Sequence, residues 1–107
     1  MAYDIPVAAL VFDHQAAAAL IGEPSDYFDN ERMDRYDGLE RLMKLTGLPV
    51  ENFSSEDQSI YYIGLAVFSD FRIDIDAALI SKAAALKAKY PHPLVESSQL
   101  AVVSQFN

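Results

Sequence analysis

Two short apolar runs, PVAALVF at residues 6–12 and IYYIGLAVF at 60–68, constrain the fold more than any other feature. Each is apolar on every side, so each belongs in the core, either as a helix segment or as a buried strand. Six alanines in residues 4–22 favour helix for the first run. Ser55 and Gln58 form a capping box ahead of the second. We expect an all-α, compact bundle of four to five helices; the alternative is α+β, with strands near 6–12 and 60–68.

Glycine and proline divide the chain into four blocks. Gly22 and Gly47 are each followed two residues later by a proline, and residues 90–93 read YPHP. Such pairs are typical helix stops and turns. No stretch between the blocks has the composition of a linker, so residues 1–107 are expected to form a single domain. The tail is ambiguous between a short helix and an edge strand at 99–103.

Residues 31–46 carry the clearest helical pattern. Tyr36, Leu39, Leu42 and Met43 fall on one stripe at 100° per residue, with acidic residues on the opposite side. The pairs Glu31–Arg35, Asp37–Arg41 and Glu40–Lys44 all place the acid four residues before the base, which is the favourable order in a helix.

Residues 74–90 predict another helix. Asp74 or Asp76 can cap its start. Lys87 and Lys89 fall in its last turn, where the helix dipole favours cations, and Pro91 ends it.

The charge of the chain is unevenly distributed. The net charge is −8; residues 1–58 hold twelve Asp and Glu against four Lys and Arg, whereas residues 59–107 hold four of each kind. A negative field of this kind repels nucleic acids and anionic membranes, so we expect neither to be bound directly. The chain has no cysteine, and no apolar run approaches 18 residues. We expect a soluble, cytoplasmic protein.

The residues offer little for catalysis or metal binding. Residues 23–40 contain seven carboxylates, but counting back from Gly38 as the sixth position of a calcium loop puts Met33 and Arg35 at ligand positions. Neither His14 nor His92 has a glutamate three residues earlier, as a di-iron bundle requires. Nucleophile and phosphate-loop motifs are absent from the sequence. We expect no metal, no cofactor and no enzyme activity.

A binding surface is the function that the pattern favours. Tyrosines and a methionine are interleaved with the acids, and tyrosine supplies contact area at little entropic cost. The predicted partner is a basic protein, such as a nucleic-acid-binding protein inhibited by mimicry. The predicted partner-binding residues are Asp26, Tyr27, Asp29, Met33, Asp34, Tyr36, Asp37 and Glu40.

Two alternatives stay open. The first is a helical homodimer or adaptor whose interface is the second apolar run, namely Ile60, Tyr61, Tyr62, Ile63, Val67 and Phe68. The second is a small ligand-binding domain or enzyme with a pocket near His14 or Tyr62.

In class, the chain is similar to small acidic helical inhibitors, among them bacteriocin immunity proteins, antirestriction DNA mimics and some phage-encoded anti-CRISPR proteins. The first of these also combine acidic helix residues with a Tyr-Tyr step, as at Tyr61 and Tyr62. The resemblance implies inhibition of a partner and assigns no residue a role.

Overall fold

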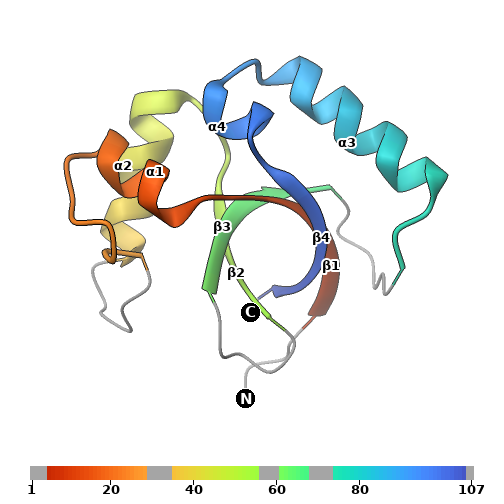
Figure 1. Cartoon of the computed structure of the whole chain (residues 1–107), viewed down its shortest axis with the longest axis horizontal. Helices are drawn as coiled ribbons and strands as arrows, with labels where there is room; N and C mark the ends of the chain where they lie inside the picture. The colour runs from red at the N-terminus through yellow and green to blue at the C-terminus, as the bar shows by residue number, and fades with distance from the viewer. Residues whose placement is uncertain (1–4, 29–34, 56–60, 68–73, 106–107) are drawn as a thin grey trace.

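In the described residues, one strand, two helices, two strands, two helices and one strand follow one another, and the four strands close into an antiparallel barrel (Figure 1). The computed structural model describes residues 5–28, 35–55, 61–67 and 74–105. The elements in chain order are β1 (Ile5–Phe12), α1 (His14–Leu20), α2 (Arg35–Thr46), β2 (Glu51–Ser54), β3 (Tyr61–Ala66), α3 (Ala77–Lys89), α4 (Pro93–Glu96) and β4 (Gln99–Gln105).

The expected all-α helical bundle is therefore wrong, because both apolar runs are strands. β1 and β3 lie where the α+β alternative placed its strands. Ser55 precedes a connection between two strands, β2 and β3, so it does not lead into a helix over 61–66. The physical reason is burial on two faces: one side of each run points into the barrel and the other side faces the helices.

The barrel has the strand order β1-β3-β2-β4, with every neighbouring pair antiparallel. If β2 and β4 were not paired, the strand order β4-β1-β3-β2 would be that of an open split-βαβ sheet. The pairing of Phe53 with Gln105 and of Ser54 with Ser104 joins β2 to β4 and closes the ring. β4 pairs with β1 from Gln99 to Gln105, and its last two residues also pair with β2. The strand predicted at 99–103 in the tail is therefore present.

The interior of the barrel is narrow and filled mostly by small side chains. Phe53 is the one phenylalanine in this inner core, and Val7, Ala9 and Val103 surround it. At Gly64, a Cβ would overlap the carbonyl oxygen of Leu10 on the neighbouring strand. A glycine is therefore required where β3 crosses β1, because any side chain there would push the strands apart.

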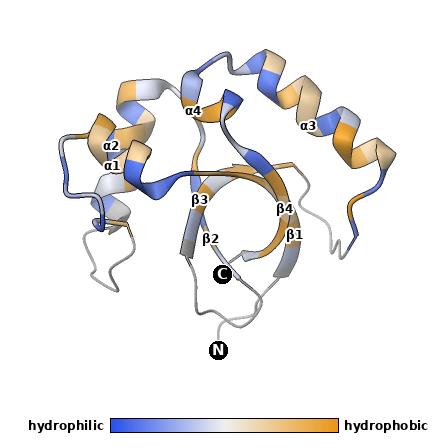
Figure 2. Ribbon diagram, in the orientation of Figure 1, coloured by the Kyte–Doolittle hydropathy of each residue, from blue (hydrophilic) through white to orange (hydrophobic). Residues whose placement is uncertain are grey.

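A second, larger core lies between the barrel and the helices. Phe12, Ile63 and Leu65 point outward from the strands and meet buried residues of the helical layer. Leu39 and Leu42 are buried in α2, and Leu94 and Val95 in α4. Figure 2 shows hydrophobic and hydrophilic residues alternating along α2 and α3, as expected for helices with one buried side.

The two helices predicted most clearly are present. α2 begins at Arg35, and residues 31–34 lie outside the described residues. α3 is capped by Asp76, whose side chain accepts a hydrogen bond of 2.9 Å from the backbone N–H of Leu79.

Within α2, a Cβ on Gly38 would overlap the ring of Tyr27. Glycine at this position costs the helix about 1 kcal/mol relative to alanine, and it allows the ring of Tyr27 to approach the helix backbone. Among the described helices, none is long and apolar enough to span a membrane.

Candidate protein-binding surface

The predicted partner-binding residues lie in and before α2. Asp26, Asp37 and Glu40 are all exposed, and we refer to these three as the acidic surface. Tyr36 belongs to α2, but its side chain is not described. Asp29, Met33 and Asp34 lie outside the described residues.

Tyr27 lies differently from the way the sequence indicated. Its side chain is half-buried, with its ring perpendicular to that of Phe28 at a centroid distance of 5.0 Å. The same ring rests against the backbone of α2 at Gly38. Tyr27 therefore anchors the segment after α1 onto α2, and only part of it is available to a partner.

Arg41 fastens α1 to α2. Its Nη1 donates a hydrogen bond of 2.7 Å to Oε1 of Glu23, and its Nη2 donates one of 2.6 Å to the carbonyl oxygen of Ile21. The bond to Glu23 raises the pKa of Arg41 above its ordinary value, and the nearby carboxylate of Asp37 contributes in the same direction. Sequence spacing predicted an Asp37–Arg41 pair; the hydrogen-bonded partner of Arg41 is Glu23, 18 residues away.

Glu40 and Lys44 form the pair that the sequence predicted. Lys44 Nζ lies 3.3 Å from Glu40 Oε1, and the two side chains are 76% and 63% exposed. A pair this exposed contributes only about 0.3–0.5 kcal/mol and exchanges easily with other partners. The Glu31–Arg35 pair lies outside the described side chains.

A shallow groove of about 440 Å³ runs beside this pair. Its lining is apolar at Leu20, Ile21 and Leu45 and cationic at Arg41 and Lys44. Sequence reasoning missed the groove because it joins residues from two helices that are about twenty positions apart. The one available signal was Leu45, which falls at the edge of the apolar stripe of α2.

Of the predicted oligomer-interface residues, Tyr61, Tyr62 and Ile63 lie in β3, and Val67 follows it. Ile63 is completely buried and belongs to the core outside the barrel. Tyr62 and Val67 are half-buried, and Tyr61 is in β3 with an undescribed side chain. Ile60 and Phe68 lie outside the described residues. The second apolar run is a barrel strand, so its apolarity is explained without a dimer.

His14 and Tyr62, proposed separately as pocket residues, lie near each other. Their ring centroids are 6.4 Å apart, and the ring of Phe28 is 6.1 Å from His14. Asn52 is paired across the sheet with Ile63, the residue next to Tyr62, and its Nδ2 is buried with no hydrogen-bond acceptor in the described part of the chain. Within the described ranges, no group of three or more His, Asp or Glu side chains could hold a metal ion.

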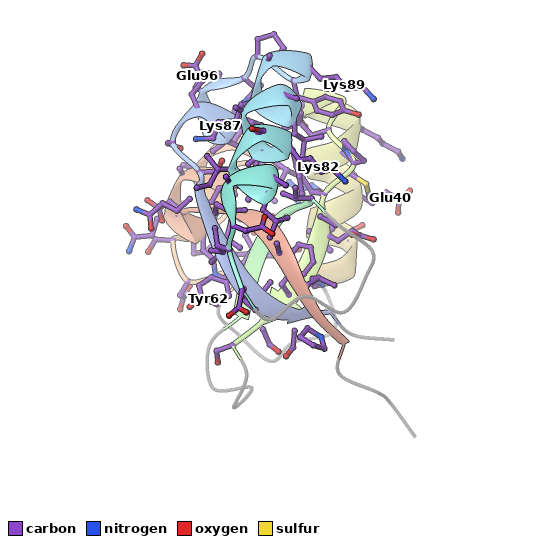
Figure 3. All side chains as sticks on the ribbon, turned by 90° about the vertical axis from the view of Figure 1, so that its right-hand side faces the viewer. Glu40, Tyr62, Lys82, Lys87, Lys89 and Glu96 are labelled. Atoms are coloured by element: carbon purple, nitrogen blue, oxygen red, sulfur yellow. The ribbon has the colours of Figure 1, made fainter. Side chains whose placement is uncertain are left out.

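The opposite flank of the barrel holds equal numbers of acids and bases over residues 74–98. α3 carries Lys82, Lys87 and Lys89, and Figure 3 shows the three lysines along the helix; Asp74 and Asp76 precede it, and Glu96 lies in α4. Lys87 Nζ donates hydrogen bonds to the carbonyl oxygens of Ser98, at 3.0 Å, and Glu96, at 3.4 Å. Lys89 lies over the ring of Tyr90, with Nζ 5.4 Å from the ring centroid.

The chain matches no protein-family model, no curated protein and no solved structure. Its chemistry must therefore be argued from its own residues.

Proposed function

We propose that this protein is a non-enzymatic binding protein that engages a basic protein partner through the acidic surface. The observation that supports this is the difference in charge between the two flanks. Residues 13–46 contain eight Asp and Glu against four Lys and Arg, whereas residues 74–98, which include α3 and α4, contain three of each kind. Of the four bases in that acidic segment, Arg41 is bound to Glu23 and Lys44 lies beside Glu40.

The chemistry of such a surface favours a partner that normally binds nucleic acid. Clustered carboxylates present negative charge to a basic groove as phosphates do, and they speed the encounter by long-range attraction. Occupying the nucleic-acid site of a cytoplasmic protein is therefore the inhibitory role that we assign. Salt should weaken the complex, because exposed charges are screened beyond about 8 Å at physiological ionic strength.

The proposal is tested by capture with two variants of equal charge. Asp26→Lys/Asp37→Lys alters the acidic surface, and Asp74→Lys/Glu96→Lys alters exposed acids near α3 and in α4. Each double variant moves the formal net charge from −8 to −4. The wild type and the control variant should retain the same basic protein from an extract of the source cells, released by salt. The acidic-surface variant should lose it.

Equal retention by all three proteins, or retention of no basic protein by the wild type, would contradict the proposal. Circular dichroism spectra of the variants serve as the control for folding. This control matters because Asp37 lies in the first turn of α2, where a carboxylate favours the helix by about 0.3–1 kcal/mol.

A second candidate is a small-ligand site at His14 and Tyr62. The observation that favours it is the approach of the imidazole of His14 to the phenol ring of Tyr62. A thermal-shift screen with metabolites, repeated on Tyr62→Phe, tests it. A ligand that raises the melting temperature of the wild type and not of the variant supports the site; no response to the panel removes its support.

A further inference from the structure

Apolar side chains are exposed at one place beside the acidic surface. Among the described residues, the large hydrophobic side chains with substantial exposure are Leu20 at 39%, Leu45 at 60%, Ile75 at 43% and Ile80 at 58%. Leu20 and Leu45 come from different helices and line the same groove, together with Ile21. An apolar groove rimmed by charged residues is typical of a surface that binds another protein.

The charges along this side of α2 have a definite order. Asp37 and Glu40 come first, and Arg41 and Lys44 follow toward the C-terminus, with Leu45 next to them. At 100° per residue these five positions fall within an arc of about 140°, so they share one side of the helix. The side is thus acidic at its N-terminal end and basic and apolar at its C-terminal end.

A face with this order is complementary to a second copy of itself running in the opposite direction. Parallel copies would place acid against acid and base against base, whereas antiparallel copies place the acids of each helix against the bases of the other. Two-fold interfaces between identical chains require this self-complementarity. A different partner would need bases opposite Asp37 and Glu40 and acids opposite Arg41 and Lys44. A second copy of α2 in the antiparallel direction already has this arrangement.

We propose that the protein self-associates as a two-fold dimer through the groove and the exposed side of α2. In this dimer, Glu40 of each copy pairs with Lys44 of the other. Leu45 and Leu20 become covered by the second copy. The internal pair between Glu40 and Lys44 is exposed and weak, so exchanging it for a pair between copies has a small cost.

The dimer does not depend on the proposed function. The two are nevertheless linked, because Asp37 and Glu40 belong both to the acidic surface and to the dimer face. Self-association and a basic partner therefore compete for α2. The dimer is the form in which the acidic surface is occupied, and the partner binds the monomer.

Sedimentation equilibrium at 0.15 M salt, from about 10 μM to 1 mM, measures the self-association directly. The wild type should show a monomer–dimer equilibrium within this range, as expected of a small interface. Leu45→Asp should raise the dissociation constant at least tenfold. The matched control is Ile80→Asp, which makes the same kind of change at an exposed apolar residue of α3 and should leave the constant within twofold.

A charge exchange between copies tests the antiparallel pairing. Glu40→Lys and Lys44→Glu should each weaken self-association about tenfold when studied alone, because two symmetric pairs become repulsive. Mixing the two variants should restore dimers containing one copy of each, since opposite charges then face each other in both pairs. No effect within one chain can produce this rescue.

A wild type that is monomeric at 1 mM would overturn the proposal. So would a dimer insensitive to Leu45→Asp, or a mixture of the two charge variants that associates no better than either alone. None of these results would bear on the capture experiment, which is carried out at concentrations where the monomer predominates.

Discussion

The flank formed by α1 and α2 and the flank formed by α3 lie on opposite sides of the barrel (Figure 1), and they are attached to it differently. α2 buries Leu39 and Leu42 in the large core and is fastened to α1 by Arg41. α3 buries Leu79 and Ala83, which belong to neither of the two core clusters. The large core is thus built on α2 more than on these residues of α3.

The two flanks also differ in charge, and the difference shows how a small barrel can carry a directional surface. The barrel strands supply few charged side chains, so the potential around the molecule is set by what the helices add. α2 carries Asp37 and Glu40, each with a base four residues further along the helix. α3 carries separated lysines that interact with backbone carbonyls and a tyrosine ring.

The largest expected difference between the flanks is in the cost of a core deletion. Leu42 and Leu79 are both completely buried. Leu42→Ala should reduce the free energy of unfolding by about 4 kcal/mol, and Leu79→Ala by about 2.5 kcal/mol, because Leu42 belongs to the large core cluster and Leu79 lies outside both clusters. Urea denaturation of the two variants measures both values. Equal losses would mean that α3 is packed as firmly as α2.

A smaller effect is expected at the start of α3. Asp76→Ala removes the hydrogen bond to the backbone of Leu79 and should cost about 1 kcal/mol. Because the buried residues Leu79 and Ala83 of α3 lie outside the core cluster that contains Leu39 and Leu42 of α2, amide exchange should accelerate in α3 and remain unchanged in α2. Acceleration spread evenly over both helices would show that the two flanks unfold together.

The smallest effect is expected at the exposed pair on α2. Glu40→Gln should change the free energy of unfolding by less than about 0.5 kcal/mol, because both side chains of the pair are largely in solvent. Urea denaturation beside the wild type measures the difference. A loss above about 1 kcal/mol would assign Glu40 a structural role and argue against its availability to a partner.

The helical spacing of apolar residues made α2 and α3 predictable from the sequence. Their boundaries were predictable from single residues, namely the stop at Gly47, whose φ is +75°, and the cap at Asp76. β1 was not predictable in the same way. Its alanines suggested helix, but Ala9 is small because the barrel interior is narrow, a constraint that appears only once four strands close. β2 is four residues long and has one apolar side chain, Phe53, so it carries no pattern to detect.

The candidate surface was predictable in part. Asp37 and Glu40 are exposed because they lie opposite the apolar stripe of α2, as the helical period indicated. The bond between Arg41 and Glu23 and the groove formed with Leu20 were not predictable, since both depend on how two helices pack against the barrel. The spacing along the helix predicted Asp37 as the ion-pair partner of Arg41, whereas in the tertiary structure the hydrogen-bonded partner is Glu23.

The difference in potential between the flanks can be measured without a partner. Paramagnetic relaxation of backbone amide protons by a cationic and by an anionic nitroxide, compared residue by residue, reports the local electrostatic potential. We predict stronger relaxation by the cationic probe over residues 23–28 and 37–40, which hold four carboxylates and no base, and a weaker preference, or the opposite one, over residues 77–89. The same preference in both regions would contradict the account.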